Sequence, residues 1–303
     1  MYRTPRQQSG RHGLKIRLLG GFRIEVSAQV VADSDWRLQK ARALVKLLAL
    51  APRHRLTRDE AMERLWPELE PAAALNNLYY ALHVARAALE GGVPVKSGGS
   101  SALQLAGGVI TFSPSGSVCI DIETFQTAAT AAWQSKDPIA YSKALNLYAG
   151  ELLPEDRYED WAARPREMLR DIQLRLLMDL AQIRQERGEY PEAIASLTQL
   201  MTEEPTHEEA CASLMFLHAA AGQRWNALRA FAQLRTALRE ELDVEPSAAT
   251  QHLHADILAG ALAATTAGAH AASNLTTPGI TSIGRKRELG HGHSSAPRVA
   301  WSS

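Results

Sequence analysis

An internal repeat of 34 residues is the feature that most constrains the fold of this chain. Gly188-Glu189-Tyr190 recurs 34 positions later as Gly222-Gln223-Arg224. Three further positions recur at the same spacing: Ala181 corresponds to Met215, Ala193 to Ala227 and Leu197 to Phe231. A glycine suits the tight turn between two helices, and a small alanine lets paired helices approach closely. The repeat therefore predicts helix pairs that stack on one another and share a core.

The helical pattern extends well beyond the repeated segment. From about 122 to 259 the apolar residues keep a helical period, and we expect seven helices there. The expected breaks lie near Asp137-Pro138, Pro154–Trp161, Gly188, Pro205, Gly222 and Pro246. A helix–turn–helix period of 34 residues is that of tetratricopeptide repeats (TPR). Residues 117–262 are therefore predicted to form an all-α, TPR-like domain.

The N-terminal third has a different pattern of apolar and polar residues. Residues 14–32 alternate apolar and polar side chains on both sides of Gly20-Gly21, which predicts paired short strands. Three helices are expected at about 38–50, 57–66 and 71–90, the second opened by a Thr57/Glu60 capping box. A hairpin is expected next, with Val93–Val95, a turn from Ser97 to Ser101, and Leu103–Phe112 with a break at Gly107-Gly108.

Strands, three helices and a hairpin are the element order of a winged helix, whose second and third helices make a helix-turn-helix. The expected fold class is therefore mainly α. An N-terminal winged helix-turn-helix of α+β type would span residues 14–116 and precede the TPR-like domain. Residues 1–13 are expected to be a flexible N-terminus, and residues 263–303 a disordered tail without apolar periodicity.

The formal net charge of zero conceals three unlike parts. Residues 1–96 hold 16 Lys/Arg and 9 Asp/Glu, a net of +7. Residues 117–262 hold 13 and 23, a net of −10, and residues 263–303 hold 4 and 1, a net of +3. A basic segment that coincides with a helix-turn-helix indicates nucleic acid as the partner of that segment.

The third expected helix is the main candidate for contact with bases. Leu75, Leu78, Leu82, Ala85 and Leu89 share one helical face and should pack inward. The candidate DNA-contacting residues on the opposite face and its flanks are Asn76, Asn77, Tyr79, Tyr80, His83 and Arg86. Asn reads adenine through two hydrogen bonds, and Tyr and His donate to phosphate. The alternative is a solvated face without a partner.

Basic residues around this helix are candidates for phosphate contact. They are Arg37, Lys40, Arg53, Arg55, Thr57, Arg58 and Lys96, where Thr57 contributes a hydroxyl and Lys96 is expected in the wing. Several of them cluster at the start of the second helix, and helix N-termini favour phosphate. Ordinary surface charge is the alternative for each one. Trp36 and Trp66 are expected to pack in the core.

Several functional classes find no support in the sequence. The two cysteines, Cys119 and Cys211, exclude a disulfide framework, and neither a phosphate-binding loop nor a hydrolase or zinc motif occurs. The carboxylate pairs of the middle region, such as Glu208-Glu209, fit solvated helix ends better than acid/base chemistry. His291 and His293 would make only a weak metal site. We expect no enzyme, no cofactor, no metal and no membrane span, and a cytoplasmic location without a signal peptide.

Several motifs together resemble a known family. The first group is Trp36, Lys40-Ala41-Arg42-Ala43-Leu44, Arg55-Leu56-Thr57-Arg58-Asp59-Glu60, Leu65-Trp66-Pro67 and Asn76-Asn77-Leu78. It resembles the winged helix of SARP-type bacterial transcriptional regulators, which is related to the OmpR/PhoB-type DNA-binding fold. The second group is Asp121–Phe125, Leu147–Pro154, Ala227–Phe231 and Leu242–Pro246, which is similar to their bacterial transcriptional activator domain.

This resemblance, over about 14–262, implies a sequence-specific activator. Its third helix would lie in the major groove, its wing on the adjacent backbone, and its partners would be double-stranded DNA and RNA polymerase. The family often places Arg along the recognition helix, where this chain has Leu75, Tyr79 and Val84. Residues 281–289 resemble the entry to an NTPase domain, so the chain is expected to be a regulator truncated at that entry.

The sequence thus predicts a DNA-binding transcriptional activator whose TPR-like domain mediates dimerisation or polymerase contact. Two alternatives stay open at this stage. One is a TPR-type scaffold whose winged helix serves only protein contacts. The other is a small-molecule sensor in which the helical domain holds an effector.

Overall fold

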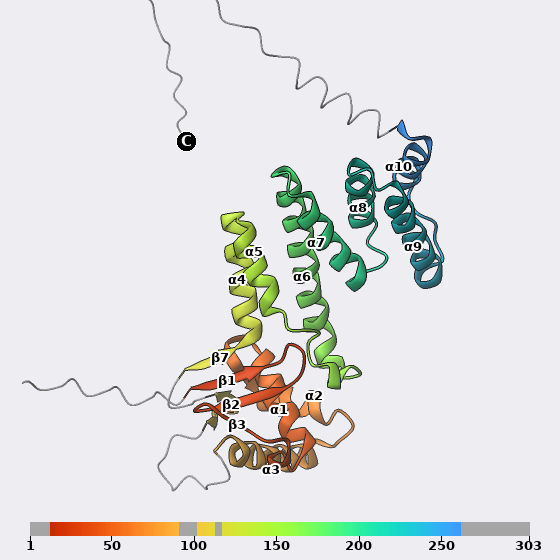
Figure 1. The fold of residues 1–303 in the computed structure, drawn as a ribbon. Helices are drawn as coiled ribbons and strands as arrows, with labels where there is room; N and C mark the ends of the chain where they lie inside the picture. Colours follow the sequence, from red (N-terminus) through yellow and green to blue (C-terminus); the bar gives the residue numbers. More distant parts are fainter. Residues whose placement is uncertain (1–12, 91–101, 113–116, 262–303) are drawn as a thin grey trace, which may run out of the picture.

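The computed structural model describes residues 13–90, 102–112 and 117–261. Its strands are β1 (Leu14–Arg17), β2 (Arg23–Val26), β3 (Gln29–Val30), β4 (Arg55–Thr57), β5 (Leu103–Ala106), β6 (Val109–Phe112) and β7 (Val118–Ile120). Its helices are α1 (Gln39–Leu50), α2 (Arg58–Leu65), α3 (Pro71–Leu89), α4 (Asp121–Ser135), α5 (Pro138–Leu147), α6 (Asp160–Glu186), α7 (Tyr190–Glu203), α8 (Glu208–Ala220), α9 (Arg224–Leu242) and α10 (Ala248–Ala259). The expected class, mainly α with a small N-terminal β component, is confirmed (Figure 1).

Some expectations concern residues outside these ranges. They include the N-terminus before Gly13, the strand Val93–Val95, the turn Ser97–Ser101, Lys96 and the tail 263–303 with its two histidines.

The N-terminal sheet has the strand order β3-β2-β1-β7. Strands β1 and β2 are antiparallel, with Ile16 opposite Ile24, as the alternation around Gly20-Gly21 predicts. Strand β7 pairs in parallel with β1, so that Ile16 also lies opposite Ile120. The sequence did not reveal β7, because three residues are too few to establish a period. This strand leads directly into α4.

The second sheet has the order β4-β6-β5 and corrects the predicted hairpin. Its turn is formed by Gly107 and Gly108, with φ of 57° and 77°, where the sequence predicted only a break. Two successive residues in the left-handed region suit a two-residue hairpin turn, and glycine adopts that conformation without strain. Strand β4, at the segment expected to open the second helix, pairs with β6.

One hydrophobic core joins the winged-helix segment to the first helices that follow it. It contains Leu18 of the β1–β2 region, Leu44 of α1 and Leu82 of α3 together with Phe125 of α4 and Tyr141 of α5. Trp36 is buried in this core and Trp66 is partly buried against it. Helix α4 stands on the N-terminal sheet, as Figure 1 shows. The two segments therefore do not fold around separate cores.

Backbone hydrogen bonds hold this junction together. The Asp121 carboxylate accepts hydrogen bonds from the backbone N–H groups of Leu18 and Leu19, both at 2.9 Å. The Gly20 N–H donates to the Glu151 carbonyl at 2.9 Å, and the Leu153 N–H to the Leu18 carbonyl at 2.9 Å. A Cβ on Gly20 would lie 2.8 Å from the Ala149 carbonyl oxygen, so the chains meet where only glycine fits.

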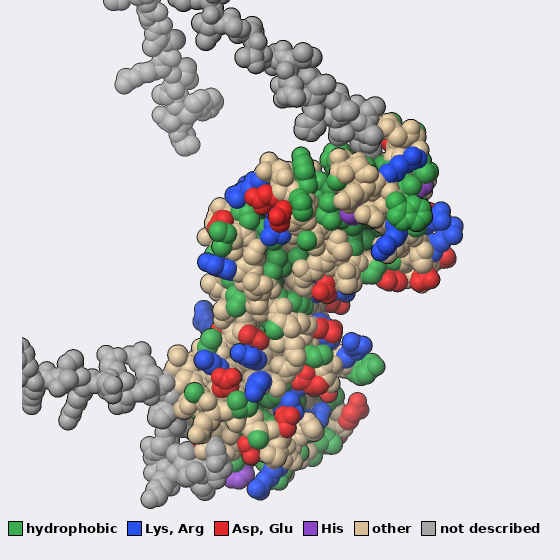
Figure 2. Space-filling model, in the orientation of Figure 1, with side chains coloured by type: hydrophobic (Ala, Val, Ile, Leu, Met, Phe, Trp, Pro, Cys, Tyr) green, Lys and Arg blue, Asp and Glu red, His purple; other side chains and the backbone are tan. Residues whose placement is uncertain are grey.

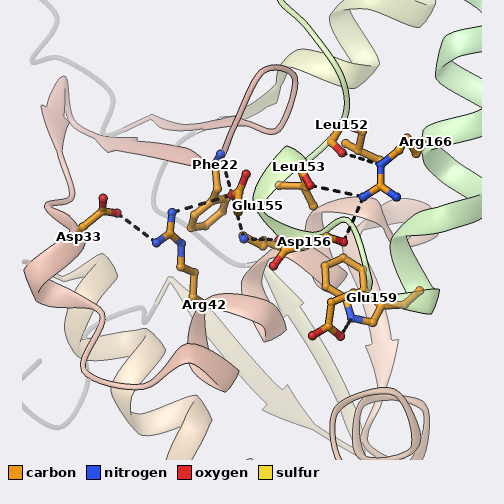
Figure 3. Close-up of polar contacts among 11 residues, drawn as sticks. Phe22, Asp33, Arg42, Leu152, Leu153, Glu155, Asp156, Glu159 and Arg166 are labelled. Carbon is orange, nitrogen blue, oxygen red and sulfur yellow. Dashed lines mark hydrogen bonds and ion pairs between the residues drawn. The ribbon is translucent and has the colours of Figure 1, made fainter.

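Buried charge reinforces the junction (Figure 3). The side chain of Lys46 in α1 is 3% exposed and forms ion pairs with Glu155, at 3.0 Å, and Asp156. Glu155 also accepts a hydrogen bond from the Phe22 N–H at 3.1 Å. Arg166 of α6 donates to the carbonyls of Leu152 and Asp156, both at 3.1 Å. These contacts fix residues 151–156 against both α1 and α6.

The remaining helices confirm the predicted repeat. Seven helices, α4–α10, occupy residues 121–259, with breaks at the expected positions. Gly188 and Gly222 have φ of 76° and 73° and lie at the turns that follow α6 and α8. The positions related by 34 residues are buried in a second core, as with Ala193 and Ala227. Helix α6, 27 residues long, contributes side chains to both cores.

We predict that Asp121→Ala lowers the free energy of unfolding by about 2–4 kcal/mol, since two N–H groups lose their acceptor. Asp121→Asn should cost about half as much, because its one amide oxygen can still accept from both Leu18 and Leu19, which share the Oδ2 atom of Asp121. Urea denaturation of both variants measures this. Equal losses for the two variants would contradict the assigned hydrogen bonds.

A second prediction concerns acid stability. Burial alone raises the pKa of Glu155, but hydrogen bonds from its own backbone N–H, Lys46 and Phe22 outweigh it and place this pKa below the ordinary value of 4.5. A lowered carboxyl pKa stabilises the folded state above the unfolded-state pKa, and this contribution is lost as the pH falls through the folded-state pKa. Glu155→Gln should therefore be less stable than the wild type at pH 7. Denaturation at a series of pH values should show the two converging as the pH falls below 4.5; a constant difference would contradict this.

Candidate nucleic-acid interface

Helix α2 begins with the capping box that the sequence predicted. The Thr57 hydroxyl accepts a hydrogen bond from the Glu60 N–H at 3.2 Å, and the Glu60 carboxylate accepts one from the Thr57 N–H at 2.9 Å. The hydroxyl also donates to that carboxylate at 2.7 Å. These hydrogen bonds hold the pKa of Glu60 below its ordinary value. The Thr57 hydroxyl thus builds the start of α2.

Helix α3 follows α2 after a short turn and starts at Pro71, whose fixed φ suits a first helical position. Leu78, Leu82, Ala85 and Leu89 are buried, as predicted, whereas Leu75 is only partly buried. The opposite face is exposed and carries Asn76, Asn77, Tyr79, Tyr80 and His83. Tyr79 and Tyr80 are 48% and 60% exposed. The helix contains no carboxylate over its 19 residues.

Arg86 differs from the other α3 candidates. Its Nε donates to the Leu103 carbonyl of β5 at 2.9 Å, and the side chain is partly buried. This hydrogen bond attaches α3 to the hairpin. The helical pattern placed Arg86 beside the exposed face but gave no information about its neighbour in the hairpin.

The basic candidates near α2 lie beside the hairpin. Arg55 is exposed on β4 and lies opposite Thr111 of β6. The Arg58 N–H donates to the Gly108 carbonyl at 2.8 Å, so the start of α2 adjoins the hairpin turn. Arg53 is exposed and has a φ of 56°. These three arginines form the basic edge of the helix-turn-helix.

Two other phosphate candidates lie elsewhere, and one falls outside the structure. Lys40 lines a groove between the winged helix and α6, together with Glu63, Glu159 and Asp160. Arg37 is exposed just before α1. Lys96 lies outside the described residues. Figure 2 shows basic and acidic side chains interspersed on the visible face, so that face has no uniformly basic patch.

Comparison with known proteins identifies the helical region. Residues 120–258 match the family described as the bacterial transcriptional activator domain. The transcriptional regulator RedD of Streptomyces coelicolor is 28% identical over 255 residues, which cover 81% of this chain and 71% of RedD. The chain is therefore similar to the SARP-type transcriptional regulators. Its relatives are regulatory proteins.

Further relatives of this chain differ widely in length. The regulatory protein AfsR of Streptomyces coelicolor is 27% identical, and the match covers 84% of this chain but only 25% of AfsR. The regulatory protein DnrI of Streptomyces peucetius is 27% identical, with 73% and 84% covered. The chain therefore spans about a quarter of AfsR and most of DnrI.

A solved structure supports the fold. Mycobacterium tuberculosis EmbR, solved in complex with a low-affinity phosphopeptide, superimposes with a TM-score of 0.61 at 20% identity. The match covers 86% of this chain and 71% of EmbR. At this identity the likeness concerns the winged-helix plus TPR-like fold alone.

Two negative findings apply to the described part of the chain. None of its helices combines the length and apolar character needed to cross a bilayer. Within the same ranges, no three His, Cys, Asp or Glu side chains lie close enough together to hold a metal ion.

We predict that Thr57→Ala lowers the free energy of unfolding by about 1 kcal/mol, because the N-terminal cap of α2 is lost. Thr57→Ser keeps the hydroxyl and should change stability by less than half as much. Thermal and urea denaturation of the two variants provide the measurement. A neutral Thr57→Ala variant would contradict the capping role.

Proposed function

We propose that this regulator binds double-stranded DNA through its winged helix, residues 14–116, with α3 in the major groove. The observation that carries the proposal is the exposed, carboxylate-free face of α3. In Figure 1 this helix lies at the opposite end of the molecule from α8–α10, so a duplex can approach it. A carboxylate on this face would be repelled by the DNA phosphates, and α3 carries none, so nothing on the helix opposes the approach of a duplex.

The side chains of this face suit base edges. Asn76 and Asn77 carry amides, which pair with adenine through one donor and one acceptor. Tyr79, Tyr80 and His83 offer further donors and apolar ring surface to phosphates and bases. In our proposal, amide and hydroxyl groups of α3 carry out the recognition that other members of the family assign to arginine.

The basic edge of Arg53, Arg55 and Arg58 would fix the protein on the sugar–phosphate backbone, together with Arg37 and Lys96. We assign Thr57 a capping role without a phosphate contact, because its hydroxyl and its backbone N–H both donate to the Glu60 carboxylate. We assign Arg86 and Lys40 secondary roles, because Arg86 holds β5 and Lys40 faces a groove lined by both acidic and basic side chains. Phosphate contacts of this kind set orientation and affinity without reading sequence.

The TPR-like domain, residues 117–262, would supply the protein contacts. Stacked helix pairs build extended surfaces for partners, and we propose RNA polymerase or a second copy of the chain as the partner. We assign this regulator no catalytic activity and a place in the cytoplasm with its DNA. Analytical ultracentrifugation of the full chain, with and without its DNA site, measures the mass of the complex. We expect the mass of two chains on the DNA; the mass of one chain would contradict the dimer.

The first DNA prediction separates backbone contacts from general charge. Arg55→Ala should weaken binding to all duplexes alike and reduce the slope of log K against log salt concentration by about 1, the contribution of one phosphate contact. Arg187→Ala, an exposed arginine at the end of α6, is the matched control and should change neither quantity. Fluorescence anisotropy at several salt concentrations measures both. Equal effects of the two variants would refute a specific phosphate contact.

The second DNA prediction concerns specificity. A site enriched from a random pool by the full chain should lose about 1–3 kcal/mol of binding free energy with Asn76→Ala, while non-specific binding stays the same. Tyr190→Ala, a similarly exposed position on α7, serves as control. If Asn76→Ala leaves the preference for the enriched site intact, α3 does not read it through this residue.

A further inference from the structure

A cavity of about 520 Å³ lies in the TPR-like domain, away from the DNA-contacting surface. Its walls come from the segment Tyr148–Glu151, from α6 and from α7. A volume of this size is in the range of pockets that hold small organic molecules.

One wall carries an unsatisfied polar group. The side chain of Gln173 in α6 lines the cavity, although the residue as a whole is only 4% exposed. Its buried Oε1 atom has no hydrogen-bond partner. An unpaired buried acceptor costs free energy, so such groups call for an explanation. Rotation about the last side-chain bond, which has a shallow energy profile, can turn this oxygen toward the cavity.

The arginines of the cavity are both bound to protein acceptors. Arg166 donates to the carbonyls of Leu152 and Asp156 and pairs with Glu151 at 3.2 Å. Arg170 donates to the Glu203 carbonyl and pairs with Glu204 at 2.9 Å. The guanidinium group of Arg166 is therefore largely occupied, and Arg170 is held beside Glu203 and Glu204 through its Nη2 atom.

Acceptors, in contrast, are available. The Glu203 carboxylate is exposed at the cavity and has no ion-pair partner within 4.0 Å among the described residues. Burial, Glu203 and Glu151 raise the pKa of the Tyr148 hydroxyl, which stays neutral at physiological pH. The cavity thus combines a free carboxylate and an unpaired amide oxygen with neutral hydroxyl and amide groups.

We propose that this cavity binds a small organic cation rich in N–H donors, an amine or a guanidinium compound. The cation would donate to Gln173 Oε1 and pair with the Glu203 carboxylate. Charge-assisted hydrogen bonds of this kind are shorter and stronger than neutral ones.

Titration calorimetry of the full chain with agmatine and with benzylamine tests the proposal, with glutarate as the anionic control probe. We expect saturable binding of at least one amine and none of glutarate. Gln173→Met and Glu203→Gln should each weaken the amine by about tenfold or more, as expected when one charge-assisted hydrogen bond is lost. Glu240→Gln, an exposed carboxylate on α9, is the matched control and should leave binding unchanged.

The Gln173→Met variant also separates a ligand-binding from a structural role. If Gln173 serves a ligand, its replacement by an apolar side chain of similar size should raise the melting temperature of the free protein while weakening amine binding. A fall in melting temperature with amine binding unchanged would assign Gln173 a structural role and overturn the proposal. Absence of binding by both amines, or equal binding by the Gln173→Met variant, would overturn it as well.

Discussion

The arrangement of the whole molecule depends on the short segment 118–121, which belongs to two structures at once. Its first three residues, β7, complete the N-terminal sheet by pairing with β1. The next residue, Asp121, begins α4 and accepts hydrogen bonds from Leu18 and Leu19. Burial raises the pKa of its carboxyl group, against the opposing effect of these hydrogen bonds. Burying the carboxylate costs free energy, and the hydrogen bonds from Leu18 and Leu19 offset that cost.

The helices of this protein were predictable because each carries its own signals. Caps such as Thr57, prolines such as Pro71 and the glycines Gly188 and Gly222 mark ends that depend only on neighbours in sequence. The strands β4 and β7 were missed because their pairing partners lie far along the chain, at β6 and β1. Gly107-Gly108 was predicted only as a break within one strand, although it forms the turn between β5 and β6.

The candidate site divides in the same way. The exposed face of α3 follows from helical periodicity, so Asn76, Tyr80 and His83 could be named from the sequence. The contacts of Arg86 and Lys40 depend on β5 and on the start of α6, which periodicity does not place. Lys46 escaped notice altogether, since its burial against Glu155 and Asp156 joins segments about 110 residues apart. The sequence gives no sign that Gln173 lines a cavity, because the other walls come from residues 148–151 and from α7.

The shared core has a consequence for recombination between regulators of this family. A crossover at residue 117, where the composition changes, would separate β1 from β7 and Lys46 from its two carboxylates. Chimeras should instead exchange the winged helix together with α4, α5 and residues 151–156 as one block. Helix α6 contributes to both cores and should move with that block, and a joint at Gly188 or Gly222 would still divide the second core.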